Sequence, residues 1–61
     1  MNFEDKYEVL MDENGHSILV EATTAEIRVD GLIEYVRFLN VNGDIVSAFR
    51  LSAIRGFFKH K

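Results

Sequence analysis

Alternation of apolar and polar side chains is the main signal in this 61-residue chain, and it is clearest between residues 32 and 51. Two apolar runs there are joined by Asn42-Gly43, a dipeptide typical of a tight hairpin because both loop residues adopt positive φ. A two-residue loop brings one apolar set onto a single face, since side chains alternate along each strand. We predict that this face packs against the core; it holds Val36, Phe38, Ile45, Phe49 and Leu51.

The opposite face of this hairpin combines apolar and cationic side chains. In the predicted register Leu39 lies opposite Val46, and Tyr35 lies opposite Arg50. Such a face is too apolar for an ordinary exposed face and too charged for an ordinary core. Five of its residues form what we call the mixed face: Tyr35, Arg37, Leu39, Val46 and Arg50.

A second hairpin is predicted around Asn14-Gly15, between residues 6–11 and 16–22. With a two-residue loop, Val9 lies opposite Val20 on an apolar face. The same register places two carboxylates opposite each other, Glu8 and Glu21, which is mildly destabilising. The remaining segments predict a strand over 25–29, a turn at Asp30-Gly31, a strand over 32–41, one 3₁₀ turn over 52–54 and a last strand over 55–59.

These elements predict a mainly β fold. Residues 1–5 are expected to form a flexible acidic lead, and residues 6–61 a single small domain. Five or six short strands with turn dipeptides between them indicate an antiparallel meander that curls into a small barrel or half-barrel. The final third, with its tight hairpin, 3₁₀ turn and short last strand, resembles the second half of an SH3-like barrel in architecture alone.

An α+β fold with a helix near residues 31–39 is the alternative. Thr23 and Glu26 fit a capping box, and helical spacing also relates Leu32, Ile33, Val36 and Leu39. Gly31 near the start of this segment favours the strand, as do the β-branched and aromatic residues within it.

Composition excludes several classes of protein and leaves a small binding domain. The chain has no cysteine, so it has neither disulfides nor thiolate metal sites. It has no apolar run near the ~20 residues that a membrane-spanning helix needs, and we expect a cytoplasmic protein. Residues 1–30 hold eight carboxylates against two cations, whereas residues 31–61 hold five cations against two carboxylates. This asymmetry is typical of a polar interaction surface.

Nothing in the sequence predicts catalysis, a metal site or a cofactor. The serines lie in no nucleophile motif, His16 flanks a turn where we expect solvent exposure, and His60 is expected to be mobile near the end of the chain. Asp12, Asn14 and His16 alternate as in a calcium loop, but the glycine falls at the wrong position. Asp, Asn and Gly are better explained as turn residues. We predict a non-enzymatic protein with no small-molecule substrate.

The function we predict is protein binding or self-association through the mixed face. Tyrosine and arginine are enriched at binding hot spots, and a chain this small gains stability from burying a second apolar face. By analogy of size and composition, an accessory or regulatory role of phage or mobile-element type would suit such a protein.

Two alternative functions involve nucleic acids. Cations and aromatic residues lie together near the C-terminus, as in proteins that bind single strands: Arg55, Phe57, Phe58, Lys59 and Lys61. The net charge of −3 disfavours this alternative, because nucleic-acid affinity depends on neutralising phosphates. The acidic first half could instead mimic DNA and occupy a basic site on a partner.

Overall fold

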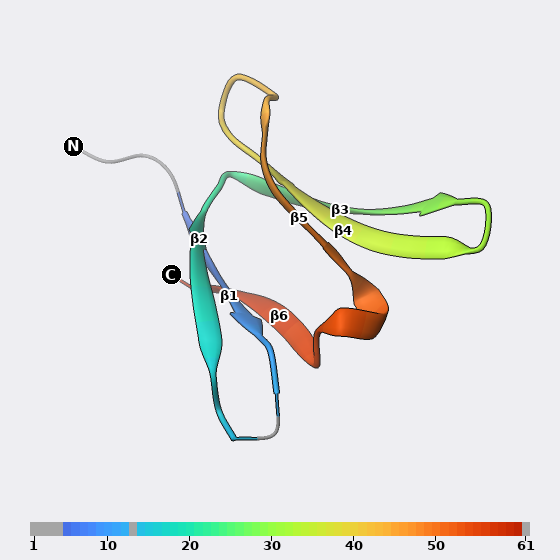
Figure 1. Ribbon diagram of the computed structural model, residues 1–61. Coiled ribbons are helices and arrows are strands. Elements are labelled where there is room, and N and C mark those ends of the chain that lie inside the picture. Colours follow the sequence, from blue (N-terminus) through green and yellow to red (C-terminus); the bar gives the residue numbers. More distant parts are fainter. Residues whose placement is uncertain (1–4, 13, 61) are drawn as a thin grey trace.

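The computed structural model describes residues 5–12 and 14–60. The described residues form β1 (Lys6–Leu10), β2 (Ser17–Glu21), β3 (Thr24–Asp30), β4 (Ile33–Leu39), β5 (Ile45–Arg50), a single 3₁₀ turn η1 (Leu51–Ala53) and β6 (Gly56–His60). The strands make two three-stranded antiparallel sheets, in the orders β2-β1-β6 and β3-β4-β5 (Figure 1). We call them the β1 sheet and the β4 sheet, after their central strands.

The prediction of a mainly β fold is confirmed, and the alternative helix near residues 31–39 is wrong. That segment forms the turn after β3 and then β4, the central strand of its sheet. Valine, isoleucine, tyrosine and phenylalanine fit a pleated surface, and pairing on both sides outweighs the helical spacing of a few leucines. The 3₁₀ turn and the short last strand are also present where the sequence predicts them, within one residue.

The β1 sheet joins the two ends of the chain, because β6 returns to pair antiparallel with β1. The β4 sheet is a meander of three consecutive strands. The tips of the three hairpins point in different directions, with the β3–β4 tip furthest from the β1 sheet (Figure 1). Within the described residues the strands thus form two three-stranded sheets, an arrangement consistent with the predicted small barrel-like fold but without the pairing that would close it.

The loop between β4 and β5 is longer than the predicted two-residue turn. The Gly43 N–H donates to the Asn40 carbonyl at 3.0 Å, and Gly43 has a φ of 85°. Asn42 does not adopt the positive φ that a two-residue loop would require. Instead the Asn40 side-chain oxygen accepts the N–H groups of Asn42 and Asp44, at 2.9 and 3.0 Å. The side chain of Asn40 therefore selects a type I turn followed by a left-handed glycine.

The loop between β1 and β2 has the same internal bonding. Asp12 Oδ1 accepts the N–H groups of Asn14 and His16 at 3.0 and 3.2 Å, and Gly15 has a φ of 87°. This longer loop shifts the register by two residues from the predicted one, so Tyr7 and not Val9 lies opposite Val20. A shift of two keeps every side chain on its predicted face. The shift also moves Glu8 and Glu21 apart, so that the predicted carboxylate pair does not form.

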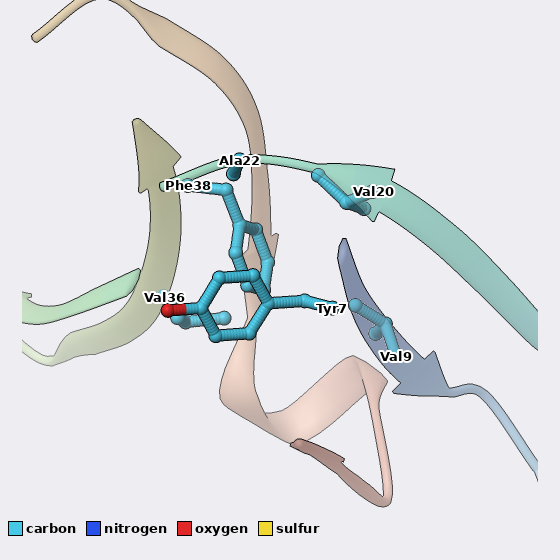
Figure 2. Packing of buried hydrophobic residues seen from close by; sticks show 6 residues of the cluster. All are labelled: Tyr7, Val9, Val20, Ala22, Val36 and Phe38. Carbon is cyan, nitrogen blue, oxygen red and sulfur yellow. The ribbon is translucent and has the colours of Figure 1, made fainter. Parts of the chain in front are cut away.

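The core lies between the two sheets. Six apolar residues are buried there: Tyr7, Val9, Val20, Ala22, Val36 and Phe38 (Figure 2). Phe38 is completely buried, and its ring centroid lies 5.1 Å from that of Tyr7, 6.0 Å from that of Phe49 and 5.7 Å from that of Phe57. Phe49 and Leu51 pack against this cluster while remaining partly exposed. The predicted inner faces of both hairpins are therefore the ones that form the core.

Ile45 is the one member of the predicted β4–β5 core face that lies outside the core, with 56% of its surface exposed. Phe38 pairs with Ser47 as predicted, but Leu39 pairs with Ile45, so the register shifts between these two pairs. The shift is a β-bulge, because two residues of β5 then lie opposite one of β4. The longer loop causes this difference from the predicted register, because it contains residues that a two-residue loop would have left paired in the strands.

The segment expected to be a flexible acidic lead, residues 1–5, falls largely outside the described residues. Asp5 is described, and it belongs to the folded domain. Its carbonyl accepts the Ala22 N–H at 2.9 Å, and its carboxylate lies 2.9 Å from Lys59 Nζ. The ordered structure therefore begins no later than residue 5.

Candidate protein-binding surface

The mixed face is the outer face of the β4 sheet, turned away from the core. Tyr35 and Arg37 alternate along β4 with the buried Val36 and Phe38, so their side chains lie on the opposite side of the sheet. Tyr35 is half-buried and lies in register between Arg28 of β3 and Arg50 of β5. The predicted pairing of Tyr35 with Arg50 is confirmed. Tyrosine and arginine are residue types enriched at binding hot spots, so their neighbouring positions on this face suit binding.

Leu39 and Val46 are not direct partners, contrary to the predicted register. Leu39 lies opposite Thr24 on one side and Ile45 on the other, and Val46 is the extra residue of the bulge. Val46 is 46% exposed and Ile45 is more exposed still. The bulge therefore adds Ile45 to the apolar end of the mixed face, because it places a second apolar β5 residue beside Leu39.

Arg37 already has a partner within the sheet. Its Nε lies 2.6 Å from Oε1 of Glu26, directly across on β3, and both side chains are partly exposed. A single-point bond of this kind fixes the orientation of the guanidinium and leaves its other N–H groups able to donate. Arg37 is thus a positioned donor on the mixed face.

An open, shallow hollow lies on the mixed face near the β3–β4 turn. Its lining residues come from β4 and β5: Ile33, Tyr35, Ala48, Phe49 and Arg50. A second hollow lies next to it, between the β3–β4 turn and η1, and shares Ile33 and Arg50 with the first. Arg50 borders both hollows, so this cation lies between two neighbouring indentations of the described surface.

The basic and aromatic residues of the C-terminal segment do not converge on one surface. The Phe57 ring packs in the core against Phe38, whereas Phe58 lies on the outer face of the β1 sheet, where its ring stacks on His60 at 5.2 Å. Lys59 is bonded to Asp5 and lies 5.8 Å from the centre of the Tyr7 ring. Arg55 precedes β6 and donates its N–H to the Leu10 carbonyl at 2.7 Å. Lys61 lies outside the described residues.

Many of the carboxylates of the first half lie against cations or histidines. Besides the Glu26 and Asp5 pairs, the Glu8 carboxylate lies 2.7 Å from His60 Nε2 and that of Asp12 lies 2.6 Å from His16 Nδ1. The four pairs are distributed over both sheets and one loop. Such dispersed and partly neutralised charge differs from the regular row of phosphates that a DNA mimic must reproduce.

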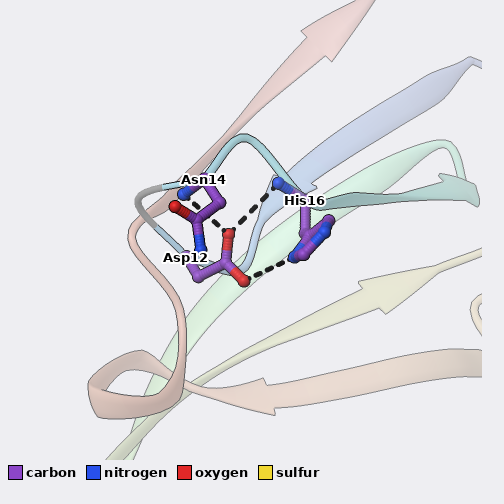
Figure 3. A network of polar contacts seen from close by, with 3 residues as sticks. All are labelled: Asp12, Asn14 and His16. Atoms are coloured by element: carbon purple, nitrogen blue, oxygen red, sulfur yellow. Dashed lines mark hydrogen bonds and ion pairs between the residues drawn. The ribbon is translucent and has the colours of Figure 1, made fainter.

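Asp12, Asn14 and His16, which alternate like calcium ligands, are bonded to one another (Figure 3). One Asp12 oxygen accepts two backbone N–H groups and the other accepts from the His16 ring. These bonds hold the pKa of Asp12 below its usual range, the His16 bond contributing most. No group of three metal-ligating side chains occurs among the residues that the structure describes. The three bonds described for the Asp12 side chain thus all lie within the turn.

His60 is not mobile as predicted, because it is the last residue of β6 and pairs with Lys6 of β1. Its ring and the Ser17 hydroxyl both bond to Glu8, which lowers the pKa of the Glu8 carboxyl, the His60 bond most strongly. A serine, a histidine and a carboxylate are therefore adjacent, but the carboxylate lies between the other two. Activation of a serine requires the histidine in that middle position.

The structure adds apolar residues that the sequence analysis did not assign to a binding surface. The β3–β4 hairpin extends beyond the area covered by the β1 sheet (Figure 1). Ile27 and Val29 are 59% and 64% exposed there, although they continue the core-facing side of the sheet, and Leu32 at the tip is fully exposed. The alternation in residues 25–29 correctly predicts their common face. The alternation contains no information on how far the β1 sheet extends, so it does not predict that these two side chains are exposed.

Searches against protein families, curated proteins and solved structures found no similar protein. No helix in the described part of the chain has the length and apolar character needed to cross a membrane.

Proposed function

We propose that this chain is a small, non-enzymatic protein-binding domain that self-associates or binds a partner through the mixed face. The single observation that supports this most is the position of Tyr35. It lies half-buried in the middle of the outer face, in register with two arginines and beside an open hollow. A tyrosine side chain has only two rotatable bonds and loses little conformational entropy when a partner covers it, and arginine is, like tyrosine, enriched at binding hot spots.

The composition of the mixed face also supports a protein as the ligand. Its apolar end holds Leu39, Ile45 and Val46, and its other end holds Tyr35 and Arg50. Interfaces between proteins commonly combine an apolar centre with aromatic and arginine residues, and they contain few lysines. The simplest partner is a second copy of the chain, because a domain with six buried apolar residues gains stability from further burial.

Leu39→Glu tests this proposal, with Val41→Glu as the matched control. Both changes put a carboxylate in place of an aliphatic side chain, but Val41 lies in the β4–β5 loop, outside the strands that form the mixed face. We expect Leu39→Glu to keep the fold and to weaken association at least tenfold in sedimentation equilibrium, because a carboxylate is costly to desolvate without a partner. Val41→Glu should associate like the wild type.

Melting curves of the same two variants exclude a trivial loss of the fold. An unfolded Leu39→Glu beside a folded Val41→Glu would mean that Leu39 is part of the core, and would overturn the proposal. Equal association of Leu39→Glu and the wild type would overturn it as well.

A further inference from the structure

The outer edge of β3 presents unpaired backbone groups. β3 is an edge strand, and backbone groups along an antiparallel strand alternate in direction. The two-residue loop at Gly31-Leu32 closes on the pair Asp30–Ile33, so the even-numbered residues of β3 bond to β4. The N–H and C=O groups of Ala25, Ile27 and Val29 then point away from the sheet, and within 5–12 and 14–60 no other backbone segment bonds to them.

This edge is apolar on one side. The Ile27 and Val29 side chains are more than half exposed, although Val36, the cross-strand partner of Ile27, is completely buried. A seven-residue edge strand with exposed aliphatic side chains is a surface on which further strands can add. The opposite edge of the sheet, β5, has a bulge, which is one way in which proteins prevent such addition.

The sequence of β3 is complementary to itself when it runs antiparallel. With Ile27 opposite Ile27 of a second copy, Glu26 lies opposite Arg28 twice, and Ala25 lies opposite Val29 twice. The charged pairs fall on the mixed-face side and the apolar pairs on the core side, since side chains alternate. Opposite charges in direct cross-strand positions stabilise a pair of strands, whereas like charges destabilise it.

The charges needed for this pairing are present and positioned. Arg28 is exposed and makes no ion pair within the described part of the chain. Glu26 is held by Arg37 through one oxygen, so its carboxylate is already oriented at the sheet edge. In the paired register the unpartnered Arg28 would meet that carboxylate, and two-fold symmetry makes the contact twice.

We propose that β3 pairs antiparallel with β3 of a second copy, centred on Ile27, and joins two β4 sheets into one six-stranded sheet. The odd-numbered backbone groups then form the new ladder, and the charged pairs fall at the closely spaced positions between its hydrogen-bonded pairs. The two edges of the β1 sheet give no such match, since pairing about Leu19 of β2 sets Ser17 opposite Glu21, and pairing about Phe58 of β6 sets Phe57 opposite Lys59. The edge contact goes beyond the proposed function, because it uses a different surface.

The first experiment uses the Leu39→Glu background, in which association through the mixed face is removed. Sedimentation equilibrium should show a dimer in this background. Adding Arg28→Glu sets a second carboxylate opposite Glu26 of the other copy, and adding Glu26→Lys sets an ammonium group opposite Arg28. Each of these like-charge contacts should weaken dimerisation at least tenfold. Lys6→Glu makes the same charge change on β1, in the other sheet, and should leave the dimer intact.

Mixing the two dissociated variants tests the register. When one Arg28→Glu chain pairs with one Glu26→Lys chain, positions 26 and 28 carry opposite charges at both contacts. A heterodimer should therefore form from two chains that fail to form homodimers. A mixture that stays monomeric while both chains remain folded by melting would overturn the proposed register. A Leu39→Glu chain that is monomeric from the start would overturn the edge contact and leave the mixed-face proposal to be judged by its own variants.

Ile27→Pro provides a test that does not depend on charge. Its N–H points away from β4, and proline is tolerated on such edge positions. We expect this variant to fold as a monomer in the Leu39→Glu background. A dimer that persists in Ile27→Pro, or one lost instead in Leu19→Asp on β2, would show that β3 is not the contact.

Discussion

The rings of Tyr7 and Phe38 lie 5.1 Å apart, one contributed by β1 and the other by β4, so this pair joins the two sheets directly (Figure 2). Phe38 also contacts rings from β5 and β6. A small domain has few such contacts to lose, because it buries only about 60% of the surface that its unfolded chain exposes. The stability of the whole chain therefore depends strongly on the one ring at the centre.

Phe38→Ala should destabilise the domain by about 3–5 kcal/mol, the usual range for removing a buried phenylalanine. Since domains of this kind are only marginally stable, most of the chain should then be unfolded at room temperature. Phe58→Ala is the matched control, because Phe58 is about half exposed on the outer face of the β1 sheet. It should cost about 1 kcal/mol or less in urea unfolding. Similar losses for the two variants would contradict the central position of Phe38.

The faces of the strands could be predicted from sequence, and so could the β4–β5 register between Tyr35 and Phe38, whereas the β1–β2 register and the pairing next to the β4–β5 loop could not. Alternation places Val36 and Phe38 inward and Tyr35 and Arg37 outward, and a register error of two residues leaves that unchanged. The loops depend instead on single side-chain bonds, such as that of Asn40, which alternation does not encode. The exposure of Ile27 follows from where the other sheet ends, a property of the whole fold.

Gly43→Val should destabilise the domain by roughly 1–3 kcal/mol, because a β-branched residue resists the left-handed conformation. Gly43 has a φ of 85°, and open space surrounds the position of a Cβ atom, so backbone strain alone would cause the loss. Gly56→Ala is the control, since Gly56 has no positive φ and also has room for a Cβ. Thermal melting should show a clear decrease for Gly43→Val and little change for Gly56→Ala. An equal decrease in both would mean that strain at Gly43 is not the cause.

Asp12→Asn should be tolerated better than Asp12→Ala. Asparagine keeps the side-chain oxygen that accepts the two backbone N–H groups, as Asn40 does in the other loop. Alanine loses those bonds and leaves the loop without its organising acceptor. The melting temperatures should therefore rank wild type, Asp12→Asn and Asp12→Ala in decreasing order. Equal melting temperatures of the two variants would mean that the ionic bond to His16, which both variants lose, contributes more to stability than the two backbone bonds.

Binding to nucleic acids is expected to be weak. The cations and rings of the C-terminal segment are divided between the core and the outer face, and Lys59 is engaged with Asp5. Filter binding or fluorescence anisotropy at physiological salt should show no micromolar affinity for single or double strands. Micromolar affinity that falls steeply with salt would contradict this prediction if it is also lost when glutamine replaces Arg55, Lys59 and Lys61.

Stability should fall in acid because of the bond between Glu8 and His60. The folded pKa of Glu8 is lowered, chiefly by this bond, so the folded state holds the proton less tightly than the unfolded chain does. The resulting stabilisation is complete above the usual carboxyl pKa of about 4.3, and it is lost as the pH falls through the lowered folded pKa.

Urea unfolding at pH 7 and pH 3 should therefore show a larger loss of stability on acidification for the wild type than for Glu8→Gln. His60→Ala should show the same reduced pH dependence, and Glu8→Gln should add little to it, since each change removes the same bond. Additive effects of the two substitutions, or an undiminished acid sensitivity in both, would mean that this pair does not link folding to pH.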